Sequence, residues 1–270
     1  MLKKFIVLFS VMMIIGLGIL VVADDAVGTD YNPVTALESL GIKVDMGFDL
    51  DARNNVDNDI QCNTAMPQLR RVSHDTPITI TSEYDVFVLL DTLALIFEAT
   101  NHSVFVDGSI IAALNDAGLR EYWSQGIKEL LREENAQRMS ELSVKYTVAQ
   151  LDAMRNITRL DVPRTELLPG QRWTRRNPIF WFGMEMEFNI THTLDRAVHG
   201  ILDVGTVDHD FGHFNFLRAL QPRNNEWRTE LFVVITRHGG NQNVGFLNRS
   251  PGSTALITFQ GHVWLFGPAA

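Results

Sequence analysis

Two glutamates spaced two residues apart are the first candidates for chemistry in this sequence. Glu185 and Glu187 alternate with methionine and phenylalanine over residues 179–191, so they share one face of a predicted strand whose other face is apolar. Two carboxylates on one face can hold Mg²⁺ or Mn²⁺ in a transferase, or serve as the acid and base of a sugar hydrolase. Asp203, in a neighbouring predicted strand, would supply a third oxygen.

The alternative for that face is a solvated surface. Asn189 lies on it and begins the glycosylation sequon Asn-Ile-Thr, and a glycan there requires open solvent. No apolar residue interrupts the face between Glu185 and Thr191. We therefore expect that neutralising Glu185 and Glu187 together changes stability by less than about 1 kcal/mol, as surface substitutions usually do.

Two histidines four residues apart form a second candidate. His209 and His213, together with Asp208 or Asp210, have the residue types of a zinc site and would serve a metal-dependent hydrolase. Their glycine and aromatic neighbours are typical of a strand or loop. The alternative is therefore a pair of histidines that hydrogen-bond on a sheet.

Arginines form a third candidate. Arg172, Arg175 and Arg176, preceded by Arg164, stand close together in a chain whose formal net charge is −9. Guanidinium groups bind phosphate and carboxylate, so these residues would bind a phosphate-bearing donor or an anionic glycan. The alternative is a loop whose arginines are neutralised by nearby carboxylates. The acidic balance of the whole chain argues against nucleic acid as a partner.

The N-terminus predicts export from the cytosol. Lys3 and Lys4 precede the uncharged apolar residues 5–22, as in a cleaved signal peptide or a type II signal-anchor that stays in the membrane. Both alternatives stay open, and both place the remaining chain in the secretory pathway. Four sequons agree with this address, at Asn101, Asn156, Asn189 and Asn248. We expect glycans at Asn101 and Asn156, and Asn248 is the weakest acceptor because Pro251 follows its serine. Cys62 is the single cysteine, so the chain has no internal disulfide, and the role of this thiol is open.

The elements that would position these groups indicate an α+β fold. Helical periodicity begins after Ser82 and returns over 119–146, with a short strand at 104–106 and a turn at Asp107 and Gly108 in between. Strands dominate from residue 179, and they predict a mixed or antiparallel sheet with the doubly apolar segment 231–236 at its centre. We divide the chain into a leader (1–23), an acidic stem or irregular lead-in (24–75) and an α+β lumenal domain (76–270), which would also suit the front part of a longer architecture.

Several of these segments resemble a known family. The resemblance is to the lumenal amino-terminal region of fukutin-like proteins. It covers residues 89–98, 102–114, 185–188, 191–192, His199 and 207–213. Asp107-Gly108-Ser109 with the apolar residues after it also looks like the opening of the wider LicD-type nucleotidyltransferases. The family's closely spaced aspartates have no counterpart after Ser109, so the resemblance implies a non-catalytic front part or an inactive relative.

Two functions therefore compete at this point. The resemblance implies a Golgi or ER protein connected with the transfer of sugar-phosphate units to glycans, with a glycan or glycoprotein acceptor and with Mg²⁺ or Mn²⁺ only if it is catalytic. The alternative, which the residues alone also fit, is a secreted α+β binding or interaction protein without catalytic activity. The hydrolase based on His209 and His213 is a third, less favoured hypothesis.

Overall fold

The computed structural model describes residues 31–46, 66–100, 103–144, 146–149, 159–175, 179–181, 184–208, 212–236 and 240–266. The chain divides into two units, Met1–Asn32 and Pro33–Ala270, and the second contains every element named below. The leader, Cys62 and the sequons at Asn101 and Asn156 lie outside the described residues. Within the described ranges, every helix is too short or too polar to cross a bilayer.

The predicted α+β class is confirmed. Helices occupy the first half of the chain: α2 (Pro33–Ser39), α4 (Glu83–Thr100), α5 (Gly108–Asp116), α6 (Arg120–Leu130) and α7 (Arg132–Ser143). Three short strands run among them: β1 (Ile42–Asp45), β2 (Gln68–Arg71) and β3 (Val104–Asp107). Longer strands fill the second half: β4 (Arg159–Leu167), β5 (Arg172–Thr174), β6 (Ile179–Trp181), β7 (Met184–Asp195), β8 (Leu202–Asp208), β9 (Phe214–Leu220), β10 (Arg228–Thr236), β11 (Gly240–Asn248) and β12 (Leu256–Phe266).

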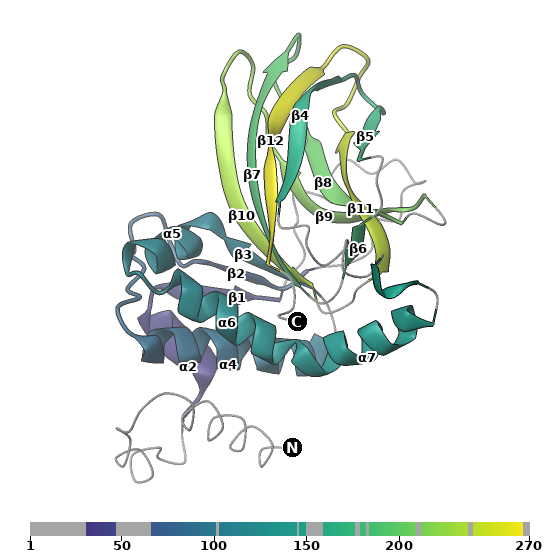
Figure 1. The fold of residues 1–270 in the computed structure, drawn as a ribbon. Helices are drawn as coiled ribbons and strands as arrows, with labels where there is room; N and C mark the ends of the chain where they lie inside the picture. The colour runs from purple at the N-terminus through teal and green to yellow at the C-terminus, as the bar shows by residue number, and fades with distance from the viewer. Residues whose placement is uncertain are drawn as a thin grey trace. The chain divides into compact units, whose positions relative to one another are not determined.

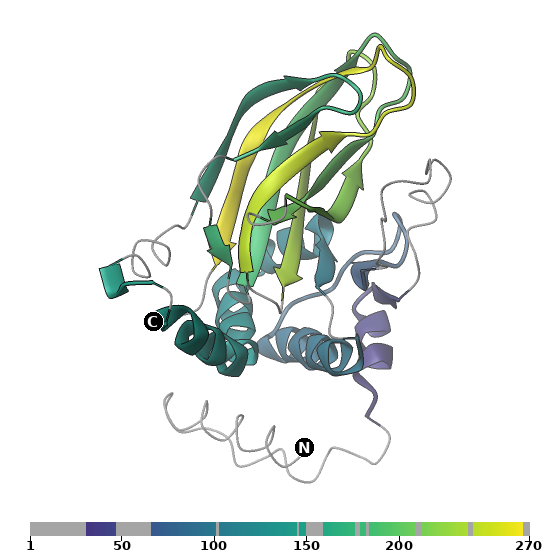
Figure 2. The same cartoon turned by 90° about the vertical axis from the view of Figure 1, so that its right-hand side faces the viewer.

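The strands form two sheets. Sheet A has the order β1-β2-β3-β10-β7-β12-β4, in which only the pairing of β2 with β3 is parallel. Sheet B is antiparallel, with the order β5-β11-β8-β9 and with β6 paired to β11. In Figure 1 the helices lie beside β1, β2 and β3, whereas β10, β7, β12 and β4 extend beyond them opposite sheet B. Figure 2 shows the same separation from the side.

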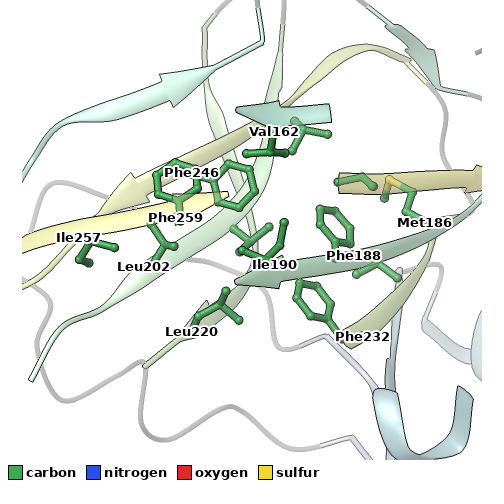
Figure 3. Close-up of a cluster of buried hydrophobic side chains, with 14 of the residues drawn as sticks. Val162, Met186, Phe188, Ile190, Leu202, Leu220, Phe232, Phe246, Ile257 and Phe259 are labelled. Carbon is green, nitrogen blue, oxygen red and sulfur yellow. The ribbon is translucent and has the colours of Figure 1, made fainter. Parts of the chain in front are cut away.

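Strand β10 connects the two hydrophobic cores. Phe232 and Val234 belong to the core between the sheets, whereas Val233 and Ile235 belong to the core beneath the helices. In the inter-sheet core the ring of Phe232 stacks on Phe188 with centroids 4.8 Å apart (Figure 3). Both faces of β10 are therefore buried over residues 232–236, which confirms the prediction that residues 231–236 form a central strand.

Three element boundaries differ from the sequence prediction. Residues 179–191 belong to two strands, β6 in sheet B and β7 in sheet A. The sequence pattern did not reveal this division, because side chains alternate in the same way in both strands. The predicted long helix is divided into α6 and α7 at Leu131, whose backbone leaves the helical conformation while its side chain stays buried, so the apolar periodicity continues through the break. The segment 24–75 contributes α2, β1 and β2 to the fold.

The turn between β3 and α5 is built as predicted. Asp107 precedes the helix, and its carboxylate accepts hydrogen bonds from the backbone N–H of Ser109 at 2.9 Å and from the hydroxyl of Ser109 at 2.7 Å. A Cβ atom on Gly108 would lie 2.0 Å from the carbonyl oxygen of Leu231 in β10. Glycine is thus required where the start of α5 lies directly against β10.

This cap gives a stability prediction. Asp107→Ala removes the acceptor for Ser109 and should lower the free energy of unfolding by about 1 kcal/mol. Urea denaturation measures the change, and Asp107→Asn, which keeps a capping oxygen, serves as the control. Equal stability of the alanine and asparagine variants would contradict a capping role.

Candidate ligand-binding face

Glu185 lies beneath helix α6 rather than on a solvated strand face. Its side chain is 0% exposed, and its carboxylate accepts hydrogen bonds from the indole N–H of Trp123 at 3.0 Å and from the hydroxyl of Ser124 at 3.2 Å. Arg120 of the same helix lies 2.8 Å from Glu185 and also 2.8 Å from Glu187, and its guanidinium stands over the ring of Phe266. The expectation that both glutamates are solvated is wrong for Glu185, because α6 covers this end of β7.

Charge balance at this position is set by Arg120. Burial raises the pKa of Glu185, although Arg120, Trp123 and Ser124 favour its charged form. The pKa of Arg120 is raised as well: burial opposes the charge, but the two glutamates outweigh it. One cation held by two carboxylates makes a structural anchor between α6 and β7, because the oxygens of Glu185 already have partners.

Asp203 does not join Glu185 and Glu187. It lies on β8 between Leu202 and Val204, which both belong to the inter-sheet core, so its own side chain points away from that core. There it pairs with Arg249 through two hydrogen bonds, and burial raises its pKa against this pairing. The three predicted carboxylates therefore lie on opposite outer faces of the two sheets. Among the described residues, no three His, Cys, Asp or Glu side chains are grouped to hold a metal ion.

The histidine and arginine candidates do not form a shared site among the described residues either. His209 and Arg176 lie outside the described residues, and His213 immediately precedes β9. Arg172 donates to the carbonyl oxygen of Gly212 at 2.8 Å, whereas the backbone N–H of Arg175 donates to Val244. Arg172 and Arg175 thus have different partners, and within the described residues they do not converge on one anion-binding site.

Two sequon asparagines are within the described chain. Asn189 is half-buried on the outward face of β7, where it is opposite Leu231 of β10 and His262 of β12. Asn248 is fully buried, and its amide donates to the carbonyl oxygens of Leu167 and Ala255. Asn248 is therefore a structural residue in the folded protein.

The part of sheet A beyond the helices presents an outward surface of polar side chains. We call this surface the open face and define it by Trp227, Arg164, Thr191, Thr193, Thr229, Gln260 and Glu166. The cross-strand registers place the two hydroxyls of Thr191 and Thr229 opposite each other, 2.8 Å apart, with Gln260 opposite Thr191 on its other side. Figure 1 shows no helix over these ends of β10, β7, β12 and β4.

An arginine–tryptophan pair extends over this open face. Trp227 directly precedes β10 and is 49% exposed, and the guanidinium of Arg164, from β4, lies over its ring, 5.7 Å from the centroid. Strands β10 and β4 are separated by β7 and β12, a distance of about 14 Å between their axes. The two side chains therefore reach towards each other over the intervening strands. Thr258 of β12, whose side chain faces outward, is only 6% exposed.

A second arginine–tryptophan pair lies on the same side of the sheet, at the start of β4 and near the end of β12. Arg159, also from β4, stands over the ring of Trp264 at 5.0 Å, and His262 meets that ring edge-on. Arg159 is in addition paired with Asp161, whose carboxylate lies 2.8 Å from its Nε. An arginine of β4 thus stands over a tryptophan twice on this side of the sheet. Arg159 is paired with a carboxylate, whereas no ion pair of Arg164 occurs among the described residues.

Only a weak signal for this surface is present in the sequence. Trp227 is the single aromatic residue in the polar segment 221–230. Arg164 is separated from it by more than sixty residues. Their contact depends on the order of strands in sheet A, which periodicity alone does not determine.

Comparisons with known proteins assign no family. No family model and no curated protein matches this chain. Among solved structures, a mutant of the family 29 carbohydrate-binding module CBM29-2 matches 42% of this chain and 94% of its own length, with 11% identity and a TM-score of 0.30. The CBM22-1 and GH10 modules of Clostridium thermocellum endo-1,4-beta-D-xylanase 10B, complexed with xylohexaose, match 40% of this chain and 25% of their own length, with 10% identity and a TM-score of 0.25. Similarities this slight assign neither fold nor function to this chain.

The buried carboxylate gives a second stability prediction. Glu185→Ala leaves Trp123, Ser124 and one side of Arg120 without their acceptor and should lower the free energy of unfolding by about 3 kcal/mol. Glu187→Ala, whose native side chain is 17% exposed, should cost less than half as much because Arg120 keeps its contact with Glu185. Denaturant titration of both variants measures the difference. Equal losses would show that Glu185 is not the buried anchor.

The raised pKa of Glu185 gives a pH prediction. An acid whose pKa rises on folding contributes stability that is fully present below its ordinary value of 4.5 and is lost as the pH rises through the folded-state pKa. Glu185→Gln removes this titration. The free energy of unfolding of the variant, relative to the native chain, should therefore increase as the pH is raised from about 4 towards neutrality. Parallel pH curves for the two proteins would contradict the raised pKa, and the exposed variant Glu166→Gln is the control.

Proposed function

We propose that this protein is a glycan-binding protein of the secretory pathway and that its ligand lies on the open face. The carrying observation is the exposed indole of Trp227, held against Arg164 on a sheet surface that is rich in hydroxyl and amide groups. The strands beneath the face are paired on both sides in β7 and β12, so its side chains project from a rigid base.

The chemistry of the face suits a sugar. A pyranose ring has an apolar surface of C–H groups, which packs on a flat aromatic ring, and a rim of hydroxyls, which requires donors and acceptors. Trp227 supplies the aromatic surface, while Thr229, Gln260 and Glu166 are exposed side chains that supply hydrogen-bonding groups around it. The contacts would be made across the sheet, as expected for an extended oligosaccharide.

Binding is favoured over catalysis by the positions of the carboxylates. Glu185 is buried and bonded beneath α6, and Asp203 is paired with Arg249 on the other sheet. A two-carboxylate mechanism requires both groups to converge on the substrate or on its metal ion. The proposal therefore keeps the glycan partner that the fukutin-like resemblance implies, without assigning sugar-phosphate transfer to the described residues. The resemblance and the secretory address of residues 1–23 stay predictions.

The role of Trp227 can be tested directly. On an array of neutral and acidic oligosaccharides, the folded native chain should bind a defined subset, and Trp227→Ala should reduce that binding at least about tenfold, because stacking on the sugar ring is lost. Its unfolding free energy should change little, since the side chain is half exposed.

Tyr84→Ala is the matched control. Tyr84 is an aromatic side chain that is 62% exposed, but it lies on α4, away from the open face. Its replacement should leave glycan binding unchanged. Failure of the native chain to bind any glycan, or equal binding by the Trp227→Ala variant, would overturn the proposal.

A further inference from the structure

We infer that Arg164 binds an anionic group on the sugar, so that the ligand of the open face is an acidic glycan, carrying a carboxylate or a sulfate. This inference rests on the proposed function of that face. It names the class of glycan, which the exposed indole alone does not decide.

The charge of Arg164 is not balanced within the part of the chain that the structure describes. Its guanidinium lies over Trp227, and no carboxylate forms an ion pair with it and no acceptor a hydrogen bond. The carboxylate two residues along the strand, Glu166, is exposed on the same side, but it is not within ion-pair distance of Arg164. A guanidinium has five N–H donors, and here they remain available to a ligand.

Arg159 shows what a balanced arginine looks like in the same surroundings. It comes from the same strand as Arg164 and also stands over a tryptophan, Trp264, yet its Nε donates to Asp161 at 2.8 Å. The difference that matters for charge is the carboxylate of Asp161, which satisfies Arg159 and has no counterpart among the described residues at Arg164. Of the two arginines, Arg164 is therefore the one whose N–H groups are available to a ligand.

Position adds specificity to this charge. The contact holds the head of Arg164 against the indole of Trp227, and so at the edge of a sugar ring that packs on the exposed part of that indole. A carboxylate or sulfate on that sugar has two oxygens that match the fork of the guanidinium, and such charge-assisted pairs are stronger than neutral hydrogen bonds. A neutral sugar would leave this donor fork without a charged acceptor.

The test uses matched oligosaccharides and the folded full chain. Isothermal titration compares a uronic-acid-containing oligosaccharide, the same oligosaccharide with its carboxyl groups reduced to alcohols, and a sulfated derivative of the reduced form. The native chain should bind at least one acidic form about tenfold more tightly than the reduced form, and added salt should narrow this margin. The preferred acidic form identifies the anionic group.

Variants assign the preference to one residue. Arg164→Gln should abolish the margin between acidic and reduced forms while retaining the binding that depends on Trp227. Arg159→Gln, the matched control, should keep the margin. Both variants should unfold at nearly the same denaturant concentration as the native chain, since both replacements are at exposed positions.

The possible results separate the inference from the proposed function. If the native chain binds acidic and reduced forms equally, the inference about Arg164 is wrong and glycan binding stands. A margin that Arg164→Gln retains, or that Arg159→Gln also removes, likewise overturns it. If no form binds, the proposed function itself fails.

Discussion

The burial of both faces of β10 over residues 232–236 is the constraint on which the remaining structure depends. Its alternating side chains enter two separate cores, one shared with sheet B and one shared with the helices. Because one strand must satisfy both cores, the helical layer and the second sheet are fixed on opposite sides of sheet A. The helices, however, cover only part of that sheet, so the outward sides of β10 and β7 divide into a covered end and an open end (Figure 1).

The covered end explains the buried carboxylate. Placing α6 against β7 encloses Glu185 at a position where the strand presents a polar side chain. A lone buried carboxylate is strongly unfavourable, and here three donors from a single helix, Arg120, Trp123 and Ser124, compensate it. The same interactions fix where α6 lies along the strand. Charge in this region is therefore used for the assembly of layers, and none of it is left to coordinate a metal ion.

The open end has the opposite character. Its threonines, Gln260 and Glu166 lie on strands that are held rigidly from below by the inter-sheet core, and Trp227 and Arg164 lie above them. The arginines of two arginine–tryptophan pairs come from β4, and only Arg159 has a carboxylate partner among the described residues, which is why we propose a ligand at Arg164 and not at Arg159. A rigid sheet with an exposed aromatic side chain loses little conformational freedom on binding, which suits recognition of a flexible oligosaccharide.

The sequence by itself determined the fold class, the central position of residues 231–236 and the cap at Asp107, because these depend on local periodicity and local hydrogen bonding. It also identified Glu185, Glu187 and Asp203 as polar positions on strands. Only the tertiary structure decided that Glu185 is buried, that Asp203 lies on the other sheet, and that Arg164 meets Trp227. Side-chain alternation shows that two faces differ, but not which layer covers each face, since that depends on strand order and on contacts between residues far apart in the chain.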